Sequence, residues 1–248
     1  MPRYFIEVSY KGTRYSGSQI QQNANSIQAE IERALHIFYK DKFHLTGSSR
    51  TDAGVHAIQN FFHFDIDDII FKSEDVYNIN AILPFDIVVK NIMKVQPQAH
   101  CRFDAIAREY SYYIYQCKDP FLMDKAFYFP YKINLDKLRD AAQQLLYYSD
   151  FNSFSKKRSQ VNNFKCSITK VSVLNENELI SFNITGNRFL RGMVRGIVAT
   201  LLKVATEKIT IDYFIKVIES KESSLADFSV PAHGLFLNAV HFPPDIFF

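Results

Sequence analysis

The segment whose residue types are best suited to chemistry is residues 48–57, which reads Ser-Ser-Arg-Thr-Asp-Ala-Gly-Val-His-Ala. It connects two apolar runs, at 42–46 and 58–65, whose patterns predict strands, and functional residues concentrate on such connections. If the backbone is extended from Arg50 to Asp52, the two side chains lie on the same face, because successive residues of a strand alternate. The guanidinium then favours the ionised carboxylate, so Asp52 is suited to act as a nucleophile or a base.

The other residues of this segment have less specific interpretations. An Arg-x-Asp pattern by itself is more often a surface ion pair beside a turn. Gly54 marks a point where the backbone needs a positive φ or where a ligand comes close. His44, His56 and His63 do not have a zinc-ligand spacing, and His56 is interpreted as a residue that holds the loop.

The first half of the chain is predicted to contain strand, helix, strand, strand, helix and strand, in that order. This is the split βαβ arrangement of ferredoxin-like and RNA-recognition modules. Asn25 and Gln28 have the spacing of a capping pair for the first helix. The predicted strands are 3–10, 42–46, 58–65 and 86–95, and the predicted helices run from 27 to 38 and from about 73 to Pro84.

The second half can be interpreted on the same plan, although no residue-level repeat supports a duplication. The predicted fold class is therefore α+β, with two ferredoxin-like or RRM-like βαββαβ halves, 1–104 and 105–248, sharing a continuous and mainly antiparallel sheet. The predicted strands are 109–117, 168–174, 179–184 and 235–241, and the predicted helices are 135–148, about 189–205 and, as an addition to the plan, 211–220.

Size and composition agree with a globular protein. The 248 residues can form one large domain or two small ones, and 47% are hydrophobic and 22% charged. No apolar run reaches the ~18 residues of a membrane span, and the first twenty residues lack a signal-peptide core, so a cytoplasmic protein is the default expectation. Three widely spaced cysteines, Cys101, Cys117 and Cys166, favour neither a disulfide framework nor a metal site, and no cofactor motif is present.

The positive charge is concentrated in the second half. The net charge of +3 is too small to indicate nucleic-acid binding by itself, but residues 105–248 carry 18 Lys or Arg against 14 Asp or Glu. Any anionic partner should therefore contact this half. Arg188, Arg191 and Arg195 have helical spacing, and a bound phosphate would suit them, although a solvated basic face is an equal alternative. Lys156, Lys157 and Arg158 form a second basic group, in a polar loop.

The segment around Asp52 closely resembles the active-site motif of the TruA-type tRNA pseudouridine synthases, the tRNA pseudouridine(38–40) synthase family. The usual form is Gly-Arg-Thr-Asp-Ala-Gly-Val-His, and only Ser49 departs from it. In that family the aspartate is the catalytic nucleophile, and the resemblance implies this role for Asp52 and an orienting role for Arg50. It also implies two halves that form a central RNA-binding cleft, a tRNA substrate and a homodimer.

Further motifs extend this resemblance over most of the chain. The segment from Arg108 to Tyr112 resembles an Arg-x-Tyr-x-Tyr motif whose first tyrosine, here Tyr110, stacks on the target base. The segment from Asn187 to Arg195 resembles Asn-x-Phe-x-x-x-Met-Val-Arg, whose last arginine contributes to the cleft. Near the amino end the family usually has Tyr-Asp-Gly and Gly-Trp-Gln, where this chain has Lys11 and Ser18 in place of the acid and the ring.

The sequence therefore predicts an isomerase that converts uridine to pseudouridine in the anticodon arm of tRNA. Asp52 would attack the ribose or the uracil ring, and both routes stay open. A non-catalytic RNA-binding protein or tRNA chaperone on the same scaffold is the main alternative, and the carboxylate argues against it, since RNA binding alone gains nothing from that charge. A glycoside hydrolase ranks last, because that chemistry usually needs a second carboxylate.

Overall fold

The chain folds into two compact units, which are described separately. The structure, a computed structural model, describes residues 1–67, 69–156 and 163–248. Unit 1 comprises Met1–Ala107 and Phe236–Phe248, and unit 2 comprises Arg108–Leu235. Helices and mainly antiparallel strands make up both units, which confirms the α+β class. The last strand packs in unit 1, whereas its position along the chain assigns it to the second half.

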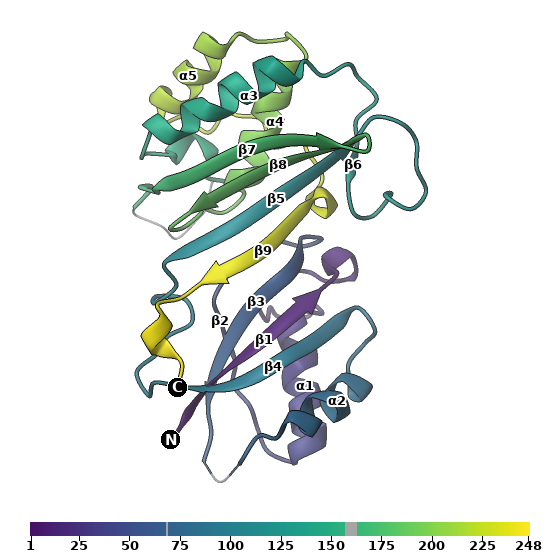
Figure 1. Ribbon diagram of the computed structural model, residues 1–248, viewed down its shortest axis with the longest axis vertical. Coiled ribbons are helices and arrows are strands. Elements are labelled where there is room, and N and C mark those ends of the chain that lie inside the picture. The colour runs from purple at the N-terminus through teal and green to yellow at the C-terminus, as the bar shows by residue number, and fades with distance from the viewer. Residues whose placement is uncertain (68, 157–162) are drawn as a thin grey trace. The chain divides into compact units, whose positions relative to one another are not determined.

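Unit 1 contains strands in the order β4, β1, β3 and β9, with β1 antiparallel to both of its neighbours (Figure 1). Strand β9 runs parallel to the start of β3, where His56 pairs with Phe236. The short strand β2 pairs with the other end of β3. The bounds are Arg3–Tyr10 for β1, Thr46–Gly47 for β2, His56–Asp65 for β3, Ile87–Val95 for β4 and Leu235–His241 for β9.

Two helices complete unit 1, α1 at Ile27–Tyr39 and α2 at Ser73–Ile82, and they pack against each other. The predicted capping pair of α1 is wrong. Ser26 is the N-cap, and its side chain accepts a hydrogen bond from the backbone of Ala29. Asn25 instead donates to the carbonyl of Arg14, because the loop before the helix turns back on itself there.

The predicted strand 42–46 is also wrong, since only Thr46 and Gly47 pair with β3. The reason lies in α1, whose polar side chains form hydrogen bonds with the backbone N–H and carbonyl of Leu45, the residue before Thr46. Leu45 donates its N–H to Glu32, and its carbonyl accepts from Gln28 at 2.8 Å. A backbone satisfied by side chains has no need of a ladder partner.

Unit 2 contains three antiparallel strands in the order β5, β8 and β7, with helices gathered on one face of them (Figure 1). A two-residue strand, β6, pairs in parallel with β5 and was not predicted. The bounds are Ala107–Tyr115 for β5, Phe127–Tyr128 for β6, Ile168–Glu176 for β7, Leu179–Gly186 for β8, Leu135–Gln143 for α3, Met193–Ala205 for α4 and Ile211–Ser220 for α5. Short 3-10 turns lie at Gly12–Arg14, Gln144–Tyr147, Asn152–Phe154, Ala232–Gly234 and Pro244–Ile246.

The long helix α4 starts later than predicted. Its N-cap is Gly192, whose φ of 74° is left-handed and ends any helix that would enter from residue 189. Arg188 and Arg191 therefore precede the helix, and only Arg195 lies on it. The prediction of three arginines on one helix face is wrong. Within the described ranges, no helix has the length and apolar character needed to cross a membrane.

A buried contact between His63 and Cys101 fixes the turn at residues 99–104 to the sheet of unit 1. His63 Nδ1 lies 3.2 Å from the sulfur of Cys101, whose S–H donates to the carbonyl of Thr46 at 3.0 Å. Burial and, to a lesser degree, the neighbouring His100 together lower the pKa of His63 to about 4. The native state therefore holds His63 neutral.

The depressed pKa of His63 predicts a loss of stability in acid. Between pH 6.5 and pH 4 the unfolded chain binds a proton at this position that the native state excludes, so the free energy of unfolding falls as pH falls through this window. At pH 4 the loss from this one group is about 3 kcal/mol. We expect urea denaturation to show that His63→Gln loses less stability than the parent between pH 7 and pH 4, by about this amount. Equal losses in the two proteins would contradict the assignment.

Candidate active site

Asp52 lies half-buried in the loop between β2 and β3, as the sequence predicts. Its backbone carbonyl accepts a hydrogen bond from Val55 N at 3.1 Å, which closes a turn. Gly54 has a φ of 81°, so the expected positive φ is confirmed. Arg50, two residues before the acid, is exposed.

The residue next to the acid, Thr51, is fastened at three points. Its N–H donates to Ser18 Oγ at 2.9 Å, and its carbonyl accepts from Ser18 N at 3.1 Å. Its hydroxyl lies 2.8 Å from the hydroxyl of Tyr10 at the end of β1. Thr51 is only 7% exposed, so water does not compete for these bonds. The position of Asp52 follows from the fixed position of its neighbour.

Asn60 of β3 holds the same loop from the other side, and it is fully buried. Its amide donates to Ser49 O at 3.2 Å and to Tyr10 OH at 3.1 Å, while its carbonyl oxygen accepts from Ser48 Oγ at 2.8 Å. Tyr10 accepts from Asn60, and either hydroxyl can be the donor in the bond between Tyr10 and Thr51. Burial raises the pKa of Tyr10 to about 12, so this hydroxyl stays a donor at neutral pH.

Ser18, one of the departures from the family pattern, is part of this network. It is 2% exposed, and besides its contacts with Thr51 it donates to Ser49 O at 3.3 Å. The preceding Gly17 has a φ of 119°, and a Cβ there would lie 2.9 Å from Thr51 O. The chain therefore approaches the loop that carries Asp52 too closely for any other residue at 17. The departures at positions 18 and 49 are thus in contact with each other.

Removing the hydroxyl of Ser18 should loosen the loop. Ser18→Ala leaves the buried N–H of Thr51 and the carbonyl of Ser49 each short of one partner, and we expect a loss of about 2 kcal/mol in the free energy of unfolding. Urea denaturation measures this loss. Ser16→Ala, in the same segment but at a hydrogen bond near the surface, is the control and should have little effect. A Ser18→Ala protein as stable as the Ser16→Ala protein would show that the hydroxyl does not hold the loop.

His56 connects the far end of the loop to two other segments. Its Nδ1 accepts a hydrogen bond from Gly12 N at 3.1 Å, and its ring stacks on Phe236 with 4.4 Å between centroids. These contacts agree with the interpretation of His56 as a residue that holds the loop.

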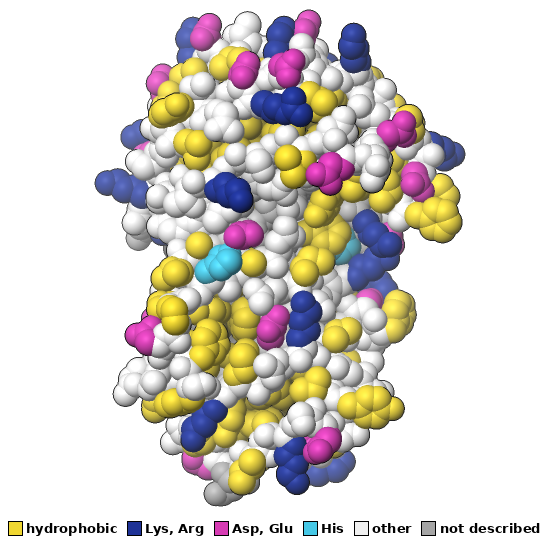
Figure 2. Space-filling model, in the orientation of Figure 1, with side chains coloured by type: hydrophobic (Ala, Val, Ile, Leu, Met, Phe, Trp, Pro, Cys, Tyr) yellow, Lys and Arg dark blue, Asp and Glu magenta, His cyan; other side chains and the backbone are white. Residues whose placement is uncertain are grey.

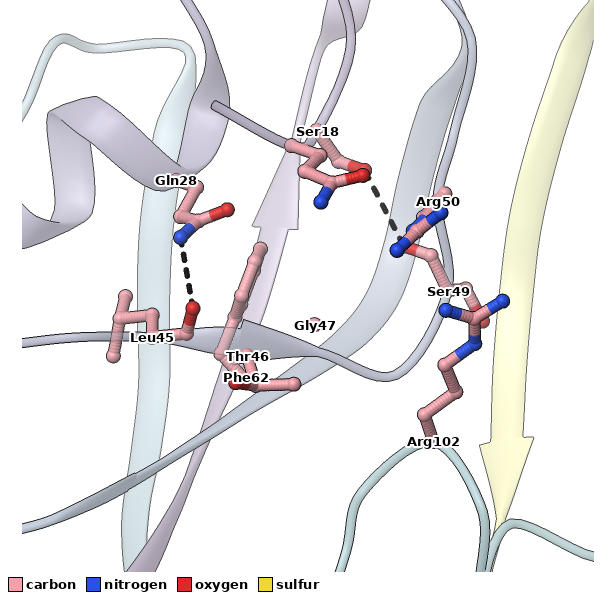
Figure 3. A pocket seen from close by; sticks show the side chains of 10 residues that line it. Ser18, Gln28, Leu45, Thr46, Gly47, Ser49, Arg50, Phe62 and Arg102 are labelled. Carbon is pink, nitrogen blue, oxygen red and sulfur yellow. Dashed lines mark hydrogen bonds between the residues drawn. The ribbon is translucent and has the colours of Figure 1, made fainter. Parts of the chain in front are cut away.

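A small pocket of about 100 Å³ lies beside the loop in unit 1 (Figure 3). Arg50 and Ser49 line it from the loop, and Arg102 lines it from the turn at 99–104. Gln28 and Leu45, joined by the hydrogen bond drawn in Figure 3, form the opposite wall. Arg102 was not singled out from the sequence.

Two of the predicted substrate-binding residues are in unit 2. Tyr110 is half-buried on β5, and its ring meets that of Phe189 edge-on with 5.0 Å between centroids. Both Nε and Nη2 of Arg195 donate to Val230 O, at 3.0 and 2.7 Å. Arg195 is therefore half-buried and anchors the segment before Pro231 through two of its nitrogens.

Of the remaining basic residues, the structure brings Lys156 beside Arg191. Arg191 is exposed and Arg188 half-buried, and the carbonyl of Arg191 accepts from Lys156 N at 3.0 Å. Lys156 therefore lies beside the start of α4, whereas Lys157 and Arg158 lie outside the described residues. On the face of the unit 2 helices visible in Figure 2, basic and acidic side chains alternate, so that face is not a single basic patch.

Sequence reasoning missed the residues that fasten the loop, namely Tyr10, Ser18 and Asn60. The one feature of the sequence that could have indicated them is Asn60, a polar residue in an apolar strand, directly before Phe61 and Phe62. A polar group there needs partners, and its partners include residues of the loop that carries Asp52.

Comparison with known proteins identifies the family. The family model described as tRNA pseudouridine synthase matches residues 6–104 and 141–243. Proteins named tRNA pseudouridine synthase A are similar over their full length: that of Parabacteroides distasonis is 42% identical over 100% of this chain and 98% of its own, and that of Porphyromonas gingivalis is 41% identical over 100% of both. That of Staphylococcus aureus strain MRSA252 is 35% identical over 96% of this chain and 91% of its own. The chain belongs to the tRNA pseudouridine synthases, a family of isomerases.

Proposed function

We propose that the protein converts uridine to pseudouridine in the anticodon stem-loop of tRNA, at positions 38, 39 and 40, with Asp52 as the nucleophile. The full-length similarity to proteins named tRNA pseudouridine synthase A supports the substrate class. The observation that carries the mechanism is the loop itself. Hydrogen bonds from β1 and from residue 18 hold Thr51, the neighbour of Asp52, a bond from β3 holds Ser49, and the acid is half-buried.

The reaction rearranges atoms within one nucleotide. The bond from N1 of uracil to C1′ of the ribose breaks, the freed uracil turns, and C5 bonds to the same C1′. N1 gains a proton and C5 loses one, so no co-substrate is consumed. Attack by the Asp52 carboxylate on the ribose or on the ring starts this sequence, and the base must first leave its stack at a cost of a few kcal/mol.

The other residues have supporting roles in this proposal. Arg50 orients the carboxylate of Asp52, and Tyr110 stacks on the everted uracil. Arg195 pairs with the acid or with a phosphate. Phosphate contacts by the remaining basic residues position the tRNA without reading its sequence, and these residues are Arg188, Arg191, Lys156, Lys157 and Arg158.

Pseudouridine mapping tests the proposal directly. Carbodiimide-blocked primer extension on tRNA from cells with and without this protein should show stops at positions 38 to 40 that depend on the protein. Stops elsewhere in the tRNA would refute the positions, and a pattern that does not depend on the protein would refute the activity. The family also suggests a homodimer, which sedimentation equilibrium of the purified protein would detect.

A further inference from the structure

The pocket beside the catalytic loop has a lining suited to an anion. Its charged lining residues are Arg50 and Arg102, and no Asp or Glu lines it within the described part of the chain. Ser18, Gln19 and Gln28 supply polar groups around the two cations. Its volume of about 100 Å³ admits a phosphate group.

Arg102 is held in position by the turn that carries it. Its backbone N–H donates to His100 Nδ1 at 3.1 Å, and the S–H of the preceding Cys101 donates a hydrogen bond to Thr46 O. In Figure 3 the guanidinium of Arg102 reaches toward the segment that carries Ser49 and Arg50. Two cations on one small pocket repel each other, and an anion between them converts that repulsion into two attractions.

A buried hydroxyl adjoins the same pocket. Ser49 lines it and is 7% exposed, and its Oγ has no hydrogen-bond partner within the described residues. A buried polar atom in this condition calls for a water or a ligand atom as its partner. The pocket therefore offers two charged donors and one hydroxyl that lacks a partner in the protein.

We propose that this pocket binds a phosphate of the tRNA backbone between Arg102 and Arg50, which makes Arg102 an RNA-binding residue. The proposal rests on the proposed function and adds to it a residue outside the catalytic motif. Guanidinium groups bind phosphate through two parallel hydrogen bonds, so two of them fix its orientation as well as its place. RNA is the source of the phosphate because Arg50 is two residues from Asp52. A phosphate held here positions the attached ribose relative to that carboxylate.

The test is a salt titration of tRNA binding. In an Asp52→Ala background, which prevents turnover, we expect Arg102→Gln to raise the Kd for tRNA about tenfold and to reduce the slope of log Kd against log salt by about one phosphate contact. Arg102→Lys should keep the slope, because it keeps the charge. Arg33→Gln, at an exposed arginine paired with Glu30 on α1, is the control and should match the parent. An Arg102→Gln protein with the parent's affinity and slope would overturn the proposal.

A second measurement does not depend on any variant. Inorganic phosphate titrated into the parent protein should shift the NMR signals of the Ser49 and Arg102 amides at low salt, and the absence of such shifts would overturn the proposal. Shifts with phosphate combined with unchanged tRNA binding by Arg102→Gln would identify a site for free phosphate and would refute the RNA assignment.

Failure of this proposal is distinguishable from failure of the proposed function. Neither measurement reads pseudouridine formation. A protein that binds tRNA through Arg102 without modifying it would refute the activity alone. A protein that forms pseudouridine and tolerates Arg102→Gln in both measurements would refute the phosphate site alone.

Discussion

Asp52→Ala should reduce pseudouridine formation by at least about 10⁴-fold, the scale on which loss of a catalytic nucleophile acts. Tritium release from 5-labelled uridine in tRNA measures the reaction directly, because the proton on C5 is lost. The affinity for tRNA should stay close to that of the parent, since a carboxylate contributes no attraction to a polyanion. The loss would therefore appear in kcat rather than in binding.

The structure explains why this variant should still fold. The hydrogen bonds that fasten the loop use the backbone of Ser49, both backbone groups and the hydroxyl of Thr51, and the side chains of Tyr10, Ser18 and Asn60. Truncation at Asp52 leaves all of them in place.

Asp140→Ala is a matched control for the loss of one acid, because Asp140 is exposed on α3. It should keep both full activity and full stability. Retention of tritium release by Asp52→Ala would refute the catalytic assignment, and a marked fall in its melting temperature would show that Asp52 has a structural role instead.

Local pattern was sufficient to predict the elements whose boundaries are set by adjacent residues. Helix α5 and strands β1 and β9 have the predicted bounds. In α5 the side chain of Thr210 caps the helix by accepting from Tyr213 N, a signal that lies in the sequence itself. The end of α2 before Pro84 is similar, since proline disfavours helix at the residue before it.

The errors arose where residues distant in the chain decide the local structure. The run at 42–45 looks like a strand, but Gln28 and Glu32 of α1 take its hydrogen bonds at Leu45. The early start predicted for α4 followed helical spacing through Gly192. This glycine has a left-handed φ, and the distant Lys156 N donates to the carbonyl of the preceding residue, Arg191. In both cases the local structure depends on contacts that the pattern of apolar residues does not contain.

In the candidate site, too, the local segment was predicted and the distant residues that support it were not. The segment carrying Arg50 and Asp52 was predicted from its residues and from its resemblance to a family motif. The residues that hold it come from β1, from β3 and from position 18, which are far apart in the sequence. Ser18 in particular was interpreted as the loss of a stacking ring, whereas its hydroxyl is a buried part of the loop's support.

Asn60→Asp should disable the site without touching the substrate. The change is isosteric, but it replaces the amide that donates to Ser49 O with a second oxygen. Tyr10 and Thr51 can reverse the direction of their mutual hydrogen bond and so give the new carboxylate one donor. Ser49 O is a carbonyl oxygen and cannot donate a hydrogen bond, so the loop must move away from the buried negative charge of the new carboxylate. We expect a loss of about 3 kcal/mol in the free energy of unfolding at pH 7 and about a hundredfold loss of tritium release.

The pH dependence of this variant separates loop support from simple misfolding. Burial raises the pKa of the new carboxyl above its unfolded value of about 3.9, so its protonated form is favoured in the native state. The variant's deficit relative to the parent is therefore smallest below that pH, where the protonated acid donates to Ser49 O as the amide did, and it grows as pH rises toward neutrality. Asn91→Asp, the same change at an exposed residue of β4, should show no such trend. A deficit that is constant with pH, or full activity in Asn60→Asp, would show that Asn60 does not hold the loop that carries Asp52.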